Sequence, residues 1–157
     1  MAMRATTGNE IHPARGALSR FAWLGVTGLL LNGNWEWLQT PFFVDSTSTL
    51  NEIVWFRLHC TLGDVLILLG CAAVVTTFKR STVWLAKPRL GDLMLLTALG
   101  VAYTSWSEVV NLVRGSWSYS DLMPLLPGTE IGLVPLAQWL VLPGLCASLA
   151  ARLARSP

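Results

Sequence analysis

The feature that most constrains this chain is a series of four apolar segments, each long enough to cross a lipid bilayer as a helix. About 20 helical residues cross the roughly 30 Å of hydrocarbon in a bilayer. We place the four spans near residues 19–42, 54–78, 91–113 and 131–152. Backbone groups that face lipid must be hydrogen-bonded within the protein, which a helix achieves within its own segment. The sequence therefore predicts an all-α integral membrane protein with a four-helix bundle.

Composition agrees with this class of protein. Of the 157 residues, 53% are hydrophobic and only 13% are charged, whereas about 25% of the residues in soluble domains are charged. The length is typical of one domain, so we expect a tail at 1–18, a single four-span domain at 19–152 and a tail at 153–157. The net charge of +2 comes without a basic block, so no nucleic-acid partner is expected.

The positive charges predict an orientation, because Lys and Arg are enriched in the cytoplasmic loops of membrane proteins. Arg57 and Arg114 lie at one end of the spans. The other nine of the eleven positive residues fall at the opposite end: Arg4, Arg15, Arg20, Lys79, Arg80, Lys87, Arg89, Arg152 and Arg155. We therefore expect both termini and the 79–90 loop in the cytoplasm, and a multi-pass protein of the inner (cytoplasmic) cell membrane.

Polar residues gather in one layer of the predicted bundle. At a rise of 1.5 Å per residue, they occupy a slab roughly 5–15 Å below the outer boundary. The polar residues of each of the first three spans share one helical face. These sets are Asn32, Glu36 and Gln39; Arg57, Thr61 and Asp64; and Thr104, Ser107, Glu108 and Asn111, with Gln138 from the fourth span at similar depth. Polar stripes inside a membrane face the bundle interior or a wet cavity, so we predict a pocket in the outer half.

Three carboxyl groups in this layer are the candidate catalytic residues. An unpaired carboxyl group at low dielectric favours its protonated form and can donate a proton. Aromatic rings at the same depth can stabilise positive charge. The candidate catalytic residues are Glu36, Asp64 and Glu108, and the candidate substrate-binding residues are Asn32, Trp35, Gln39, Arg57, Trp106, Asn111, Gln138 and Trp139.

A structural interpretation of the same residues stays open. Arg57 could neutralise Asp64, and Arg114 could neutralise Glu108. Polar side chains also hold membrane helices together through interhelical hydrogen bonds, each worth about 0.6–2 kcal/mol. The residues would then fix the bundle without acting on a ligand.

No metal or cofactor is expected. His59 lies on a different helical face from Arg57 and Thr61, and His12 falls in the polar tail, so a bis-histidine haem site is unavailable. The carboxyl groups show no ligand spacing typical of a metal centre. Three cysteines, Cys60, Cys71 and Cys146, lie in apolar runs without paired spacing and are interpreted as buried thiols.

Two proline-containing segments adjoin the predicted pocket. The segment WSYSDLMPLLPGTEIGL at 117–133 is either a lid over the pocket or an interfacial re-entrant loop. In the fourth span, Pro135 and Pro143 each lack a backbone donor, which kinks a helix. A kink would widen the bundle near Gln138.

Several motifs together resemble a family of small bacterial polytopic membrane proteins: NWEWLQTPFF, LGD at 62–64, SE at 107–108, WSYSDLMP and GLVPLAQW. The likeness covers most of the chain from Asn32 to Trp139 and implies no activity. The segment from Asn32 to Phe43 is also similar, locally, to integral membrane terpene cyclases and to EXPERA-type sterol isomerases. That likeness implies carbocation chemistry at an acidic residue, which only Glu36 matches.

Three functions are compatible with these observations. The first is an isomerase or cyclase that uses carboxyl acid–base chemistry on a lipophilic, isoprenoid-like or lipid substrate. The second is a structural or assembly subunit of a membrane complex, and the third is a carrier for a small lipophilic or cationic ligand. The expected partners are the bilayer, a lipophilic small molecule, and a second copy of the chain or a subunit of a membrane complex.

Overall fold

The fold is known from a computed structural model that describes residues 13–44 and 49–155, and the predicted orientation charge Arg4 lies outside them. The described part is built of helices: α1 (Pro13–Leu38), α2 (Leu50–Lys79), α3 (Val83–Ala86), α4 (Leu90–Arg114), α5 (Leu133–Leu153) and the short 3-10 helix η1 (Thr40–Phe42). Within these residues the only β-type pairing consists of isolated bridges in the connecting segments. The predicted all-α class is therefore confirmed.

Local chemistry explains where the long helices begin and end. Pro41, which has no N–H to continue an α-helix, follows α1 and lies within η1. Thr49 and Glu52 form a capping box at the start of α2, so this helix begins four residues before the predicted span. Gly115 ends α4 with φ of +66°, a left-handed conformation that glycine adopts without a Cβ clash.

Three helices, α2, α4 and α5, are long and apolar enough to cross a membrane. The structure thus supports a membrane protein. Although α1 has 26 residues, Asn32, Asn34 and Glu36 make it less apolar, and it is not one of these three. Its exposed side chains nevertheless include Leu29 and Leu30, which suits a lipid-facing surface, so a fourth span at α1 stays a prediction.

The predicted cytoplasmic loop at 79–90 contains a structured turn. Helix α3 lies within it, and Trp84 is buried there. The indole of Trp84 donates a hydrogen bond to the hydroxyl of Thr76 at 3.0 Å. At the start of the next helix, Asp92 forms an ion pair with Lys79. These contacts fix the connection between α2 and α4.

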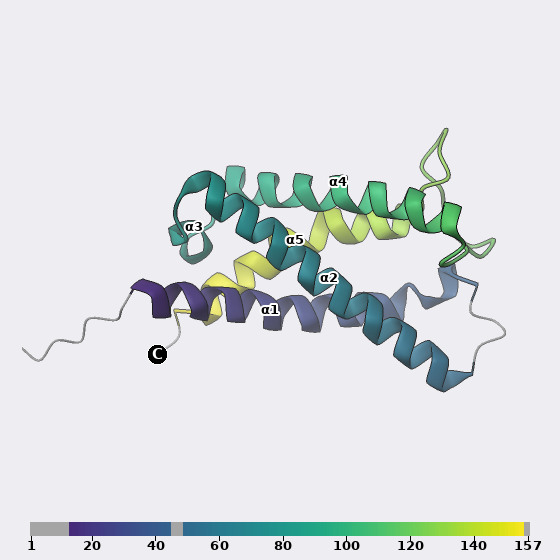
Figure 1. Cartoon of the computed structure of the whole chain (residues 1–157), viewed down its shortest axis with the longest axis horizontal. Helices are drawn as coiled ribbons and strands as arrows, with labels where there is room; N and C mark the ends of the chain where they lie inside the picture. Colours follow the sequence, from purple (N-terminus) through teal and green to yellow (C-terminus); the bar gives the residue numbers. More distant parts are fainter. Residues whose placement is uncertain (1–12, 45–48, 156–157) are drawn as a thin grey trace, which may run out of the picture.

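Helix α5 packs against both α1 and α4, whereas α1 also packs against α2 (Figure 1). The apolar core occupies the half of the molecule that includes α3. It contains Leu24, Leu68, Ala72, Val75, Trp84, Leu85, Leu96, Trp139, Leu142, Cys146, Ala147 and Ala150. The other half of the bundle holds most of the buried polar residues. The helices are thus apolar toward α3 and polar toward the opposite end.

Proline in α5 allows one helix to reach two neighbours. Of the two prolines predicted to kink the span, Pro143 lies inside the helix and Pro135 lies in its first turn. Proline inside a helix removes a backbone hydrogen bond and bends the axis. Figure 1 shows α5 changing direction near its middle, with one half beside α4 and the other near α1.

A single glycine permits the close contact between α4 and α5. A Cβ added at Gly100 would lie 2.2 Å from Cε3 of the buried Trp139 ring. The contact also positions Trp139 beside the polar half, since its ring cannot lie where it does unless position 100 lacks a side chain. Small residues commonly allow such close helix packing in membranes.

We expect Gly100→Ala to destabilise the protein by about 1–3 kcal/mol, the usual cost of overpacking a tight core. The measurement is the unfolding midpoint in mixed detergent micelles. The matched control is Gly91→Ala in the same helix, where an added Cβ meets no heavy atom within 4 Å. Equal stability of the two variants would contradict the importance of the contact.

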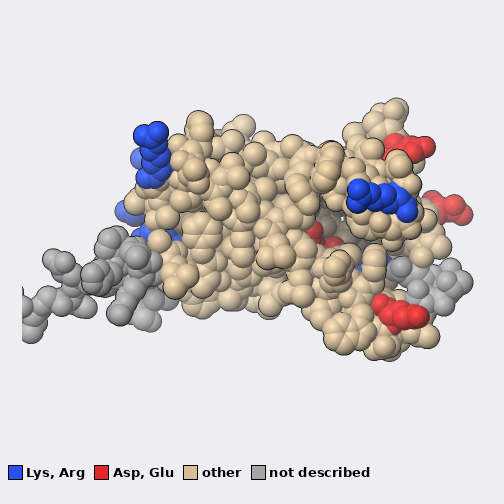
Figure 2. Space-filling model, in the orientation of Figure 1, with Lys and Arg blue, Asp and Glu red and all other residues tan. Residues whose placement is uncertain are grey.

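Charges separate along the long axis of the molecule. In Figure 2, Lys and Arg side chains gather at one end, whereas acidic side chains lie mostly at the other end, where basic side chains are also visible. Arg20 donates to the Thr82 hydroxyl at 3.3 Å, and Arg155 donates to the carbonyl of Ala86, so both ends of the described chain join the basic end. This separation agrees with the predicted sidedness, although the compartment that each end faces stays a prediction.

Candidate functional site

A cavity of about 250 Å³ lies in the polar half of the bundle. All four long helices contribute to its wall, together with residues just beyond α1 and α4. Its lining residues are Glu36, Gln39, Phe43, Phe56, Arg57, His59, Cys60, Gly63, Asp64, Ile67, Tyr103, Thr104, Ser107, Glu108, Asn111, Trp117, Pro135, Gln138 and Trp139. Figure 2 shows a hollow in this part of the surface, with carboxylate atoms visible inside it.

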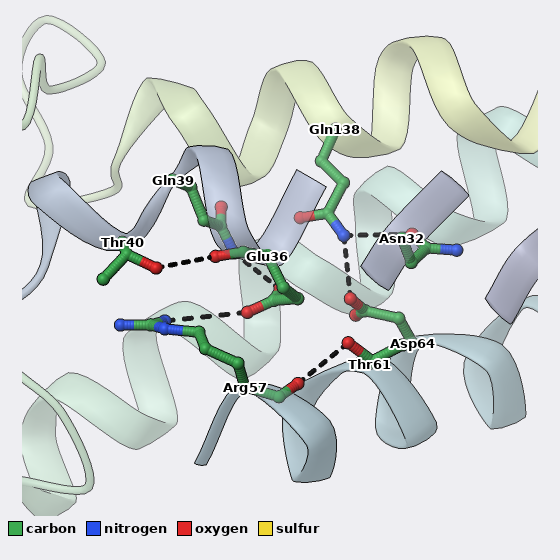
Figure 3. Close-up of polar contacts among 8 residues, drawn as sticks. All are labelled: Asn32, Glu36, Gln39, Thr40, Arg57, Thr61, Asp64 and Gln138. Carbon is green, nitrogen blue, oxygen red and sulfur yellow. Dashed lines mark hydrogen bonds and ion pairs between the residues drawn. The ribbon is translucent and has the colours of Figure 1, made fainter. Parts of the chain in front are cut away.

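Glu36 is fixed by partners from two directions (Figure 3). Its Oε1 accepts a hydrogen bond from Nε2 of Gln39, the residue just after α1, at 2.5 Å. Its Oε2 lies 3.6 Å from Nη1 of Arg57 in α2. Both members of this ion pair are buried, with side-chain exposures of 4% and 2%. The structure therefore pairs Arg57 with Glu36, whereas the sequence interpretation pairs it with Asp64.

Arg57 also lies between aromatic rings. Its guanidinium carbon is 5.1 Å from the centre of the Phe43 ring and 5.2 Å from that of Phe56. Such cation–π contacts strengthen when they are shielded from water. The planar guanidinium suits this stacking better than an ammonium group. Arg57 thus joins Glu36 to the aromatic wall of the cavity.

Asp64 is held by an amide and faces two other carboxyl groups. Nε2 of Gln138 donates to its Oδ2 at 2.7 Å and to Oδ1 of Asn32 at 3.0 Å (Figure 3). One glutamine therefore connects α5 to both α1 and α2. Glu36 and Glu108 are both close enough to repel Asp64 electrostatically. Asp64 thus has carboxyl neighbours on two sides in addition to the amide of Gln138.

Glu108 accepts a hydrogen bond from a residue that lies outside the helices. The hydroxyl of Tyr119, in the segment between α4 and α5, donates a hydrogen bond to its Oε2. The same hydroxyl accepts from the backbone N–H of Gly132 at 3.1 Å. Burial and the Glu108 carboxylate raise the pKa of Tyr119 above its ordinary value, so the phenol is protonated at neutral pH and acts as a donor. Glu108 is thus paired with Tyr119, and not with Arg114 as the structural interpretation had it.

We define the cap as residues 40–44 together with residues 115–132. Two backbone hydrogen bonds join these segments, from Val44 N–H to the Ser118 carbonyl at 2.9 Å and from Ser120 N–H to the Phe42 carbonyl at 3.0 Å. The Ser120 hydroxyl adds a bond to the carbonyl of Pro41 at 2.8 Å. The 117–133 segment is therefore hydrogen-bonded to the segment that follows α1, and its role as a lid or as an interfacial re-entrant loop stays a prediction.

We expect Tyr119→Phe to loosen the cap and lower the free energy of unfolding by about 1–3 kcal/mol. The change leaves Glu108 without its donor and the Gly132 N–H without its acceptor, and an unsatisfied buried polar group carries a cost of this size. Faster limited proteolysis within 115–132 would report the loosening. Tyr103→Phe is the control, since Tyr103 is 43% exposed; equal effects of both changes would contradict the anchoring role.

The structure places most of the predicted site residues together, but not all of them. The residues that line the cavity are Glu36, Asp64, Glu108, Gln39, Arg57, Asn111, Gln138 and Trp139. Asn32 lies behind the wall, where it accepts from Gln138. Trp35 packs against the apolar core, and Trp106 is 60% exposed and stacks edge-to-face on Tyr103. Neither of these two tryptophans lines the cavity.

Several lining residues were not predicted from the sequence. Phe43, Phe56 and Trp117 form part of the aromatic wall, and Tyr119 binds Glu108 from the cap. The motif WSYSDLMP drew attention to the segment that contains Tyr119. Its hydrogen-bond partner, Glu108, could not be predicted, because a loop has no regular geometry from which to infer contacts. His59 is exposed and also lines the cavity. This was not expected, because His59 lies on a different helical face from Arg57.

The assembled site suits proton transfer beside a positively charged or polar ligand group. Three carboxyl groups face one guanidinium, so not all of the negative charge is balanced by arginine. Aromatic rings form the rest of the wall, and the remaining polar groups are amides and hydroxyls. In the described ranges, no group of three His, Cys, Asp or Glu side chains has an arrangement that could hold a metal ion.

The fold and the site define an all-α protein with at least three helices suited to a membrane and an acidic, aromatic cavity at one end. No protein-family description, curated protein or solved structure matches the chain.

Proposed function

We propose that this protein is a membrane-embedded isomerase or cyclase that moves protons on a lipophilic, isoprenoid-like or lipid substrate. The observation that carries the proposal is the convergence of Glu36, Asp64 and Glu108 on one aromatic cavity. Acid–base catalysis requires a donor and an acceptor that flank the reacting atoms. The proposal includes α1 as a fourth span, both termini in the cytoplasm and the cavity in the outer half of an inner membrane.

The geometry favours distinct roles for the three carboxyl groups. Glu36 is balanced by Arg57 and serves to position neighbouring groups as a carboxylate. Asp64 has two carboxyl neighbours, so it is the group proposed to carry a proton. Glu108, which accepts from Tyr119, is the proposed base. Neighbouring carboxyl groups avoid ionising together, which is why the proton is assigned to the most crowded one.

The proposed reaction conserves atoms and electrons. Asp64 transfers its proton to one carbon of a double bond, whose π electrons form the new C–H bond and leave a cation on the other carbon. Removal of a proton from an adjacent carbon by Glu108 then forms a double bond at a new place, with or without prior ring closure. The rings of Phe43, Phe56 and Trp139 stabilise the cation through their faces. The proton returns from Glu108 to Asp64 before the next cycle.

Comparative mass spectrometry tests this proposal. Lipid extracts are incubated with purified wild type, with an Asp64→Asn/Glu108→Gln double variant, and with Asp121→Asn, a change in the exposed part of the cap. We expect one compound to be replaced by a product of equal mass and different retention time with wild type and Asp121→Asn only. Identical extracts from all three proteins would contradict an isomerase or cyclase.

A structural role is the second candidate, because the same polar groups connect helices. Gln138 bonds Asn32 and Asp64, and Glu36 pairs with Arg57, so α1, α2 and α5 are held together. Loss of a co-purifying membrane partner, with no change in lipid composition, would favour this role. The carrier hypothesis has less support, since the apolar core occupies the half of the bundle beyond the cavity.

A further inference from the structure

We infer that the cavity is entered sideways from the lipid, between α2 and α4, by the polar end of a single-chain amphiphile that carries a hydrogen-bond donor. The reaction at the carboxyl groups rests on the proposed function. The route of entry and the polarity of the ligand rest on the packing and hydrogen bonding of the described residues.

Of the neighbouring long helices, α2 and α4 contact each other least. Two of the other interfaces are tight: a Cβ added at Gly28 would lie 3.0 Å from Leu68 between α1 and α2, and Gly100 abuts Trp139 between α4 and α5. Residues from both α2 and α4 line the cavity, including Gly63 and Ser107. Figure 1 shows the two helices diverging toward the capped end, and the hollow of Figure 2 lies in this region.

The cap obstructs entry from the end of the bundle. The Tyr119 hydroxyl is bonded to Glu108, and its ring packs edge-to-face on Phe43. A second hollow lies at the outer side of the cap, and Phe56 and Trp117 line both this hollow and the cavity. These two side chains therefore lie between the cavity and the outside at this end.

Polar side chains mark the proposed entrance on surfaces that are otherwise apolar. His59 is exposed and lines the cavity, and Tyr103 is 43% exposed and also lines it. The neighbouring exposed residues of α2 include Leu62 and Leu66. Side chains with an apolar body and a polar tip suit the boundary between hydrocarbon and a polar group. A ligand with a polar end and a hydrocarbon chain matches both surfaces.

The cavity offers buried acceptors to such a ligand. Oε1 of Gln39 is buried and accepts no hydrogen bond within the described residues, and the same holds for Oε2 of Glu36, whose described contact is the ion pair with Arg57 at 3.6 Å. Both residues line the cavity. Buried acceptors without a hydrogen bond are uncommon in proteins, and a donor on the ligand would satisfy them. A hydroxyl or protonated amine supplies that donor, whereas an ether or ester does not.

The size of the cavity limits what enters. Pockets that enclose a whole drug-sized molecule occupy about 300–1,000 Å³, whereas this cavity occupies about 250 Å³. It therefore suits the reacting end of an amphiphile, while the remaining chain stays among lipid-facing residues of α2 and α4.

Photo-crosslinking in lipid nanodiscs tests the entrance. The probe is a diazirine analogue of farnesol with the photoreactive group near the hydroxyl. We expect cross-links on residues 59–67 and 103–111 of the wild type. Gly63→Leu adds bulk at the entrance at a position where a Cβ meets no heavy atom within 4 Å. It should reduce labelling by about tenfold or more, the change expected from a loss of about 1.4 kcal/mol in binding.

The matched control is Gly70→Leu on the same helix. Gly70 is exposed, does not line the cavity and has equally open space around an added Cβ, so labelling should match the wild type. Unfolding midpoints of both variants verify folding. Unchanged labelling in Gly63→Leu, or cross-links confined to residues 40–44 and 115–132, would overturn sideways entry.

Competition tests the requirement for a donor. Unlabelled farnesol and farnesylamine should displace the probe, and farnesyl methyl ether should displace it at least about tenfold less well, as a lost hydrogen bond to a charged acceptor predicts. Equal competition by the ether would overturn the donor requirement. Straight-chain hexadecanol distinguishes an isoprenoid preference from a general preference for long-chain alcohols, and both results are consistent with an amphiphile that donates.

Different experimental results would refute the proposed function and the proposed entrance. Labelling that depends on Gly63 but is followed by no isomerisation would retain the entrance and refute the enzyme. Isomerisation that is lost in Asp64→Asn yet is normal in Gly63→Leu would retain the enzyme and refute the entrance.

Discussion

Asp64→Asn should lower turnover by about 10²–10⁴-fold, the usual contribution of a positioned acid or base. Asparagine has nearly the same shape as aspartate, and its carbonyl oxygen can still accept the bond that Gln138 donates at 2.7 Å. The fold should therefore persist while the proposed proton donor is lost. The measurement is the rate at which the product identified by mass spectrometry forms in nanodiscs.

Two other variants serve as a control and as a second test of the proposed proton transfer. Asp121→Asn changes an exposed carboxyl group and should retain the wild-type rate. Glu108→Gln should also slow turnover, since it removes the proposed base. Wild-type rates in both Asp64→Asn and Glu108→Gln would exclude carboxyl acid–base chemistry in this cavity.

Arg57→Met should lower the free energy of unfolding by about 3–5 kcal/mol, the cost of removing one member of a buried ion pair. The change leaves the Glu36 carboxylate in a nearly water-free position without the guanidinium 3.6 Å away. It also removes the contacts with Phe43 and Phe56. Methionine retains much of the apolar stem, so the loss should reflect charge more than volume.

A double-variant cycle separates the charge from the packing. Glu36→Gln combined with Arg57→Met should recover most of the stability, because no uncompensated charge then remains and Gln39 can still donate to the new amide. Arg114→Met, at the exposed end of α4, should change stability by only about 0.3–1 kcal/mol through the helix dipole. Additive losses in the double variant would show that Glu36 and Arg57 do not act as a pair.

Periodicity and length predicted the helices well, for a physical reason. A lipid-facing helix must satisfy its backbone internally, so an apolar run of sufficient length leaves few alternatives. Helical phase also selected Glu36, Asp64 and Glu108, which line one cavity. The weaker apolar character of α1 was not expected, and among the helices of the described residues α2, α4 and α5 alone have the length and composition of spans.

Partners across the bundle could not be predicted from one sequence. Arg57 and Asp64 share one face of α2, so the sequence offers Asp64 as one possible partner of Arg57, whereas the packing of α1 against α2 brings Glu36 to the guanidinium. Depth alone selected Trp106, but its position around the helix axis turns it outward. Tyr119 reaches Glu108 through a loop, whose path has no periodicity from which to infer a contact.

The division of the bundle into an apolar half and a polar half determines which solution can exchange protons with the cavity. Closely packed apolar side chains, among them Leu24, Leu68 and Leu96, occupy the half toward α3, and such side chains do not form the hydrogen bonds along which a proton could move. Tyr119 and the cap form the polar boundary at the other end. The protonation of the three carboxyl groups should therefore follow the acidity of the compartment that the cap faces, and be insensitive to that of the compartment behind α3.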